Sequence, residues 1–164
     1  MTESSETMAM AELVFTSFLG ASHREDLERL LFFNENQSRA SEGVAVVVQR
    51  YGTPRIVVED DRLRIELSSS FSPQALYVVT RVRGTYRPVG VVVYTREDDA
   101  LVVLFVAVDG ELSGRGIKGH GMLLVRMIRE VEAIARRVRG IGRVLVYTGR
   151  AEPTRIVVPR ESGR

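Results

Sequence analysis

The chain has 164 residues, of which 45% are hydrophobic and 27% charged, with 23 basic and 21 acidic side chains. This composition is typical of one folded domain and argues against wholesale disorder. Because the chain contains no cysteine, it cannot form a disulfide, an iron–sulfur cluster, a thiolate nucleophile or a cysteine-ligated zinc site from its own residues. His23 and His120 are the two histidines, too few for a histidine-rich metal site, so no metal is expected.

The first eleven residues predict a disordered tail. Residues 1–11 are small and acidic and lack the positive charge with which a secretory signal peptide begins. The longest apolar run, residues 100–108, is far shorter than the roughly 20 residues that span a bilayer. We therefore expect a cytoplasmic protein without membrane contact and a single α/β domain over residues 12–160.

The next stretch predicts two strands and a helix between them. Residues 13–19 are typical of a strand, and Ser22 and Glu25 have the spacing of a capping box at the start of a short amphipathic helix. Residues 44–51 are apolar and β-branched, which predicts a second strand. If this strand lay at a sheet edge it would need covering, which leaves a homodimer open.

The middle of the chain predicts an antiparallel sheet. Residues 55–59 and 62–67 flank Asp60-Asp61 and predict a hairpin, since apolar and polar side chains alternate in the second arm. Residues 75–82 predict a further strand. Residues 89–94 and 101–108 are almost continuously apolar, which is typical of central strands covered on both faces.

The apolar spacing then changes to three and four residues. This spacing predicts an amphipathic helix of about 20 residues with the apolar positions Leu124, Met127, Ile128, Val131, Ile134, Ala135 and Val138. Strands are predicted after it at residues 144–148 and 154–158. Because a strand–helix–strand crossover normally joins parallel neighbours, the predicted fold is a mixed, mostly antiparallel α/β sheet with one crossover.

Residues 110–121 contain five glycines and connect a buried strand to this helix. Glycines allow a close approach of the backbone to an anion, and a helix N-terminus presents unpaired N–H groups, so the segment is typical of a phosphate cradle. Arg115 and Lys118, the single lysine of the chain, add charge, and residues 101–164 carry a net charge of +6. The segment lacks a Walker motif, and its Gly-x-Gly-x-x-Gly string is a weak signal that a flexible connector would also contain.

Residues 75–148 resemble the GNAT family of N-acetyltransferases. In that family a central strand ends in a Val-Asp-Pro-like turn, and a Gln/Arg-x-x-Gly-x-Gly/Ala loop, a long helix and another strand follow. Here Val108-Asp109 ends the strand, and the glycine loop leads to Leu123-Leu124. The resemblance implies that loop amides bind the pyrophosphate of acetyl-coenzyme A (acetyl-CoA) as cosubstrate. It also implies acetyl transfer to an amine of a small molecule or a protein.

The loop fits the family motif in two registers. Without a gap, Ser113 takes the Gln/Arg position, while a shift of three residues matches Gly119 and Gly121 to both glycines. Across both registers the resemblance implies cofactor contacts from Val106, Val108, Ser113, Gly114, Arg115, Gly116, Ile117, Lys118, Gly119, His120 and Gly121. Sixteen residues follow Thr148, fewer than the family uses for its last helix and strands. That half of the substrate side would then be either missing or supplied by the longer N-terminal part.

Two residues are candidates for proton transfer, because acetyl transfer needs a base for the amine and an acid for the thiolate. The family often uses a tyrosine beyond the strand that follows the long helix as the acid. Tyr147 is the nearest equivalent, although a half-buried sheet tyrosine would occupy the same position. Glu111 would act as the base or cap the turn. His120 would orient an anion or be exposed, and His23 is expected to be structural.

The alternative is a non-enzymatic α/β module, either a degenerate acetyltransferase fold or a nucleic-acid-binding protein. The second option would use the arginines of the C-terminal part: Arg115, Arg126, Arg129, Arg136, Arg137 and Arg139. Aromatic and basic residues are not interleaved here as they are in proteins that stack on bases, which favours the enzyme.

Overall fold

A computed structural model describes residues 13–32, 41–69, 72–82, 84–109, 117–147 and 152–159, with only the backbone at residues 41–43, 82 and 117–122. The predicted tail, residues 1–11, lies outside them. The elements in chain order are β1 (Val14–Thr16), the 3₁₀ helix η1 (Ala21–His23), α2 (Arg24–Phe32), α3 (Ser41–Tyr51), β2 (Pro54–Glu59), β3 (Arg62–Leu67), β4 (Gln74–Val82), β5 (Thr85–Glu97), β6 (Ala100–Val108), α5 (Ile117–Arg137), β7 (Arg143–Val146) and β8 (Thr154–Val157).

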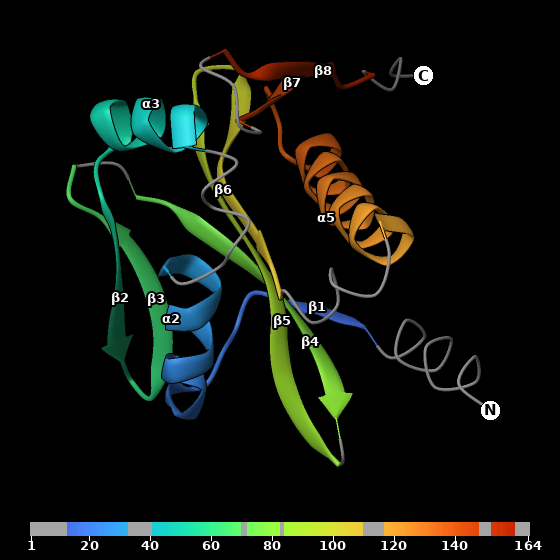
Figure 1. The fold of residues 1–164 in the computed structure, drawn as a ribbon. Helices are drawn as coiled ribbons and strands as arrows, with labels where there is room; N and C mark the ends of the chain where they lie inside the picture. The colour runs from blue at the N-terminus through green and yellow to red at the C-terminus, as the bar shows by residue number, and fades with distance from the viewer. Residues whose placement is uncertain are drawn as a thin grey trace.

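The described strands form two sheets. Six of them form one sheet in the order β1-β4-β5-β6-β7-β8, and β2 and β3 form a separate hairpin. Neighbours in the large sheet are antiparallel except β6 and β7, which are parallel because α5 crosses over between them (Figure 1). The prediction of a mixed, mostly antiparallel α/β sheet with one strand–helix–strand crossover is confirmed.

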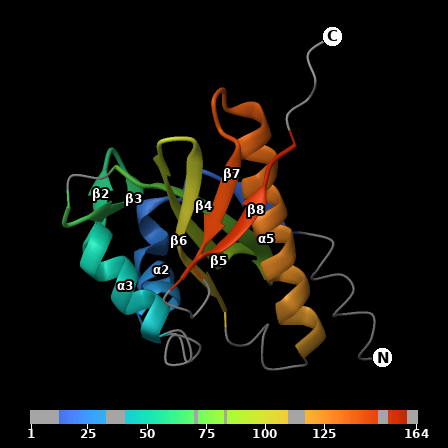
Figure 2. The ribbon, with the colours of Figure 1, turned by 90° about the horizontal axis from the view of Figure 1, so that it is seen from above.

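The large sheet is covered on both faces (Figure 2). On one face α5 buries Leu123, Met127, Val131 and Ala135 against the sheet in a single cluster. The other face is divided, because α2 and the β2–β3 hairpin share one cluster and α3 has its own. No helix in the described ranges has the length and apolar character needed to cross a membrane.

The prediction of a strand at residues 44–51 is wrong, since these residues belong to the helix α3. Val47 and Tyr51 are buried, Val44 and Val48 are half-buried, and Ala45 and Gln49 are exposed. These positions follow the helical spacing of three and four residues, which an almost continuously apolar run conceals. The edge strand that would have left a homodimer open is therefore absent at this position.

The predicted capping box is also wrong. Ser22 lies inside η1, whose N-cap is Gly20 and carries no side-chain capping bond. Backbone bonds hold this turn instead, because the Leu63 N–H donates to the Leu19 carbonyl at 2.8 Å and the Ala21 N–H donates to the Asp61 carbonyl at 3.0 Å. The β2–β3 hairpin thus fixes the start of α2, which a local motif could not indicate.

Candidate functional site

The predicted cofactor site follows β6, and part of it is described. Val106 and Val108 lie near the end of β6 and pack into the cluster that α5 covers. Five predicted residues begin α5, inside the segment expected to be a loop: Ile117, Lys118, Gly119, His120 and Gly121. Five others lie outside the described residues, and their roles stay predictions: Glu111, Ser113, Gly114, Arg115 and Gly116.

The strands β6 and β7 pair over a short stretch only, because β7 ends at Val146 while β6 continues to Val108. Residues 100–103 of β6 pair with residues 143–146, and the next N–H, that of Tyr147, still donates to the Val103 carbonyl at 3.2 Å. Beyond this point no described strand pairs with residues 104–107 on the β7 side. We call this position, where β7 ends beside the continuing β6, the β6–β7 fork. The edge of β6 that has no partner among the described strands lies before the crossover that leads to α5.

The backbone of Val106 faces into the fork. The Asp109 N–H donates to the Val89 carbonyl of β5 at 2.8 Å, so Asp109 faces β5. Backbone polar groups of successive residues in a strand point alternately to its two neighbours. Val106 lies three residues before Asp109, so its N–H and carbonyl point away from β5, towards the side on which β7 pairs with the start of β6.

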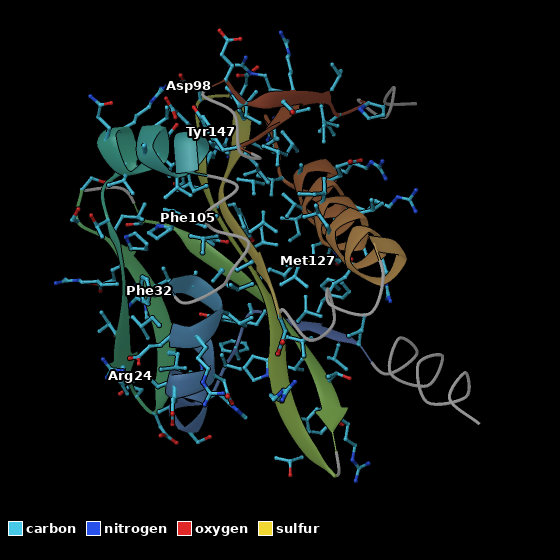
Figure 3. The ribbon with its side chains drawn as sticks, in the orientation of Figure 1. Arg24, Phe32, Asp98, Phe105, Met127 and Tyr147 are labelled. Atoms are coloured by element: carbon cyan, nitrogen blue, oxygen red, sulfur yellow. The ribbon has the colours of Figure 1, made fainter. Side chains whose placement is uncertain are left out.

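A β-bulge sets which side chains flank the fork. The register of β5 and β6 shifts so that Val93 faces Phe105 and Tyr94 faces Val103, which makes Leu104 the extra residue. Leu104 and Phe105 both pack on the α3 side of the sheet, where a regular strand would have alternated. Figure 3 shows Phe105 on the α2 and α3 side of β6 and Met127 on the opposite side.

An ion pair fixes the C-terminal end of β6. Arg87 Nη2 lies 3.2 Å from Asp109 Oδ2, and both side chains are partly buried. Asp109 is the residue that ends the strand in the family-like motif. Its side chain and its N–H thus both hold the end of β6 against β5, which fixes where the glycine-rich segment begins.

Tyr147, the predicted acid, follows the last residue of β7 and is half-buried. Its ring packs against the α3 cluster, and its side chain lines a pocket of about 230 Å³. The pocket lies between α3, the β5–β6 turn, β7 and the residue before β8. Its lining consists of Arg50, Tyr51, Glu97, Asp98, Ala100, Val102, Arg143, Leu145, Tyr147 and Pro153. Within the described ranges, the Tyr147 hydroxyl has no hydrogen-bond partner.

A polar triad closes one side of this pocket. The Tyr51 hydroxyl donates to Glu97 Oε2 at 2.5 Å, and Arg50 pairs with the other oxygen of the same carboxylate. Burial, helped by the Glu97 hydrogen bond and charge, raises the pKa of Tyr51 well above its ordinary value. Tyr51 therefore stays neutral and acts as a hydrogen-bond donor that ties α3 to the end of β5.

The opposite side of the pocket carries a second ion pair. Arg143 Nε lies 3.1 Å from Asp99 Oδ1. Asp98, the preceding residue, adopts a positive φ of 54° in the β5–β6 turn, and its carbonyl accepts a bond from Arg96. Among the described residues no basic side chain pairs with the Asp98 carboxylate. Figure 3 shows Asp98 and Tyr147 close to each other and to α3.

Sequence reasoning found Tyr147 but missed the rest of this pocket. Arg50 and Glu97 are 47 positions apart, and they meet because α3 packs across the start of β6. A strand at residues 44–51 would not have brought Tyr51 to this place. The available signal was the helical spacing of Val44, Val47, Val48 and Tyr51.

His23 and the described α5 arginines, the remaining candidates, lie on the surface of helices or are partly buried there. Nitrogen Nδ1 of His23 lies 3.8 Å from Asp26, one turn along the α2 surface. The described arginines in and just after α5 are exposed, and Arg136 and Arg137 pair with Glu132 and Glu130. Arg126 lies over the Phe15 ring, 5.6 Å from its centre. In the described part of the chain no three His, Cys, Asp or Glu side chains gather as a metal site would need.

Comparison of the chain with models of known protein families, with curated proteins and with solved structures found no match. The function is therefore inferred from the geometry of the β6–β7 fork and of the pocket.

Proposed function

We propose that the chain is an N-acetyltransferase-like protein that binds acetyl-CoA in the β6–β7 fork and transfers the acetyl group to an amine. The observation that carries this proposal is that β7 ends at Val146 while β6 continues to Val108, so that residues 104–107 have no partner on the β7 side among the described strands, beside the crossover to α5. The family resemblance of residues 75–148 points to the same ligand.

The open edge fits the middle part of acetyl-CoA. An extended chain with amide groups binds to an exposed strand edge through backbone hydrogen bonds, as a peptide does in strand addition. The pantetheine arm is such a chain, and the N–H and carbonyl of Val106 face into the fork. The bulge at Leu104 and the end of β7 would then lie near the thioester.

The pyrophosphate would lie at the start of α5. A helix N-terminus favours negative charge because its first N–H groups lack partners inside the helix. Residues 117–121 supply such groups with two glycines among them, and the chain carries its excess positive charge after residue 100. Lys118 would add a point charge to this site.

In the proposed step the neutral amine nitrogen attacks the thioester carbonyl carbon, the C–S bond breaks and an amide forms. The Tyr147 hydroxyl would give its proton to the departing sulfur, and the proton lost by the nitrogen would return through water to the tyrosine oxygen. Tyr147 suits this role because its N–H is fixed to β6 at the fork while its hydroxyl has no partner within the described ranges.

Calorimetric titration of acetyl-CoA tests the proposal. The Gly119→Glu, Gly121→Glu double variant should lose binding, because two carboxylates would repel the pyrophosphate. Val125→Glu adds a carboxylate at an exposed position of the same helix and should bind like the wild type. Absence of binding to the wild-type chain at millimolar acetyl-CoA would overturn the proposal.

Tyr147→Phe separates binding from transfer. It should leave the acetyl-CoA affinity unchanged and lower the transfer rate by about 10²-fold or more, as removal of a general acid does. The alternative, a nucleic-acid-binding module that uses the exposed α5 arginines, predicts instead a tight complex with mixed RNA that weakens steeply with salt.

A further inference from the structure

We propose that the pocket beside Tyr147 binds the acceptor as a primary alkylammonium ion, with Asp98 as its charge partner; the ion would lose one proton to water before its neutral nitrogen attacks the thioester. This inference deepens the proposed function, on which it rests for its chemical outcome. The binding of the amine itself does not require acetyl-CoA, so the two can be tested separately.

The charges of the pocket favour a cation. Its lining contains two arginines and two carboxylates, but three of these four groups already have partners. Arg50 pairs with Glu97, and Arg143 pairs with Asp99. An anion would have to displace one of these carboxylates, whereas Asp98 has no basic partner among the described residues. The unbalanced charge of the site is therefore negative.

The aliphatic lining and the volume of the pocket favour a ligand with a short unbranched alkyl chain. Its buried floor is formed by Ala100 and Val102, with the half-buried Leu145 beside them, and all three are aliphatic. Asp98 is exposed and so belongs to the rim. A volume of about 230 Å³ accepts an ammonium group with several methylene groups, and lies below the roughly 300 Å³ at which pockets for drug-sized ligands begin.

Tyr147 connects this pocket to the fork. Its N–H is bonded to Val103, where β6 and β7 separate, while its side chain lines the pocket. α3 and α5 lie on opposite faces of the sheet (Figure 2). An acceptor in the pocket would therefore approach from the α3 face, whereas the pyrophosphate would lie at the start of α5.

The test is a titration of the isotopically labelled chain with n-butylammonium chloride, followed by NMR at the methyl groups of Ala100, Val102 and Leu145. Neutral 1-butanol and anionic butyrate have nearly the same size and serve as comparison ligands. We expect saturable shifts of these methyl groups with butylammonium and weaker binding of the other two. Equal binding of all three ligands, or tighter binding of butyrate, would overturn the inference.

Asp98→Asn is the decisive variant. Asparagine tolerates the positive φ of this turn, so the change removes the charge with little effect on the backbone. Butylammonium affinity should fall about tenfold, as expected for a lost charged hydrogen bond. Asp61→Asn is the matched control, because Asp61 also has a positive φ, of 60°, in the β2–β3 turn. Unchanged affinity in Asp98→Asn would contradict the assignment.

Two results distinguish this inference from the proposed function. If butylammonium binds in an Asp98-dependent way and acetyl-CoA does not bind, the pocket assignment stands and the acetyltransferase proposal fails. If acetyl-CoA binds and butylammonium leaves the pocket methyl groups unshifted, the pocket assignment fails and the proposed function stands.

Discussion

On one face of the large sheet a single 21-residue helix, α5, packs along one continuous apolar cluster, whereas on the other face α2, α3 and a hairpin share the cover. The second face leaves space where its parts meet, and there the Tyr51–Glu97–Arg50 triad and the pocket beside Tyr147 lie. The difference indicates that the α5 face is one continuous packed core, and that the divided face provides the room for a polar site.

The largest expected effect is a cavity on the α5 face. Met127 is fully buried, and Met127→Ala should lower the free energy of unfolding by about 3 kcal/mol. Val47→Ala, also fully buried but on the divided face, should cost about 1.5 kcal/mol because two methyl groups are lost beside a pocket that can relax. Urea unfolding of both variants measures the difference. Equal losses would mean that the divided face is packed as tightly as the α5 face.

Alkaline pH should destabilise the protein chiefly through the divided face. Burial raises the pKa of Tyr77 from its ordinary 10.0 to about 12, and burial and Glu97 raise that of Tyr51 further. A raised folded-state pKa gives stability that is complete below pH 10 and is lost as the pH rises through the folded value. Tyr77 alone should account for a loss of roughly 2–3 kcal/mol once the pH has passed its folded-state pKa, and for about half of that loss by about pH 11.

Unfolding midpoints measured from about pH 8 to about pH 11 check this alkaline loss. Tyr77→Phe should flatten the pH dependence. Tyr94 lies in the cluster of the α5 face, and burial raises its pKa less markedly, so Tyr94→Phe should change the slope less. If Tyr94→Phe flattened the curve more than Tyr77→Phe, the alkaline sensitivity would not belong to the divided face.

The triad should contribute a smaller amount. Tyr51→Phe removes a hydrogen bond to a carboxylate and should cost about 1.5–2 kcal/mol, with faster hydrogen exchange in α3. Tyr94→Phe removes a neutral bond to Gln74, 3.2 Å long, and should cost about 0.5–1 kcal/mol. Hydrogen exchange that rises equally over the whole chain in Tyr51→Phe would contradict a local role in holding α3.

The sequence predicts the α5 face better than the divided face for a physical reason. The residues of α5 alternate between apolar and charged at helical spacing over many turns, so one period explains them. α3 is short and rich in valine, and its helical stripe of Val44, Val47, Val48 and Tyr51 is compatible with a strand in a local reading. A helix stabilised by tertiary packing carries little local signal.

The candidate site likewise has one part that the sequence predicts and one part that it does not. The strand–helix–strand order could be predicted from residues 100–148, and it is confirmed. The pocket could not, because Arg50, Glu97 and Tyr147 come from three elements that only the sheet order brings together. The roles of Glu111 and of Ser113–Gly116 stay predictions, since these residues lie outside the described ranges.

The smallest expected effect tests how closely α5 fits its face. A Cβ added at Gly90 of β5 would lie 3.1 Å from Met127 Cε and 3.3 Å from Met127 Sδ. Because the end of the methionine side chain can shift, Gly90→Ala alone should change the free energy of unfolding by less than about 1 kcal/mol.

In the Met127→Ala background the same methyl group would enter the space that Met127 vacates, and should raise the stability. A double-mutant cycle measured by urea unfolding should therefore give a coupling of about 0.5–1 kcal/mol. Additive effects would mean that β5 and α5 do not touch closely at Gly90, and would weaken the contrast between the tightly covered face and the divided one.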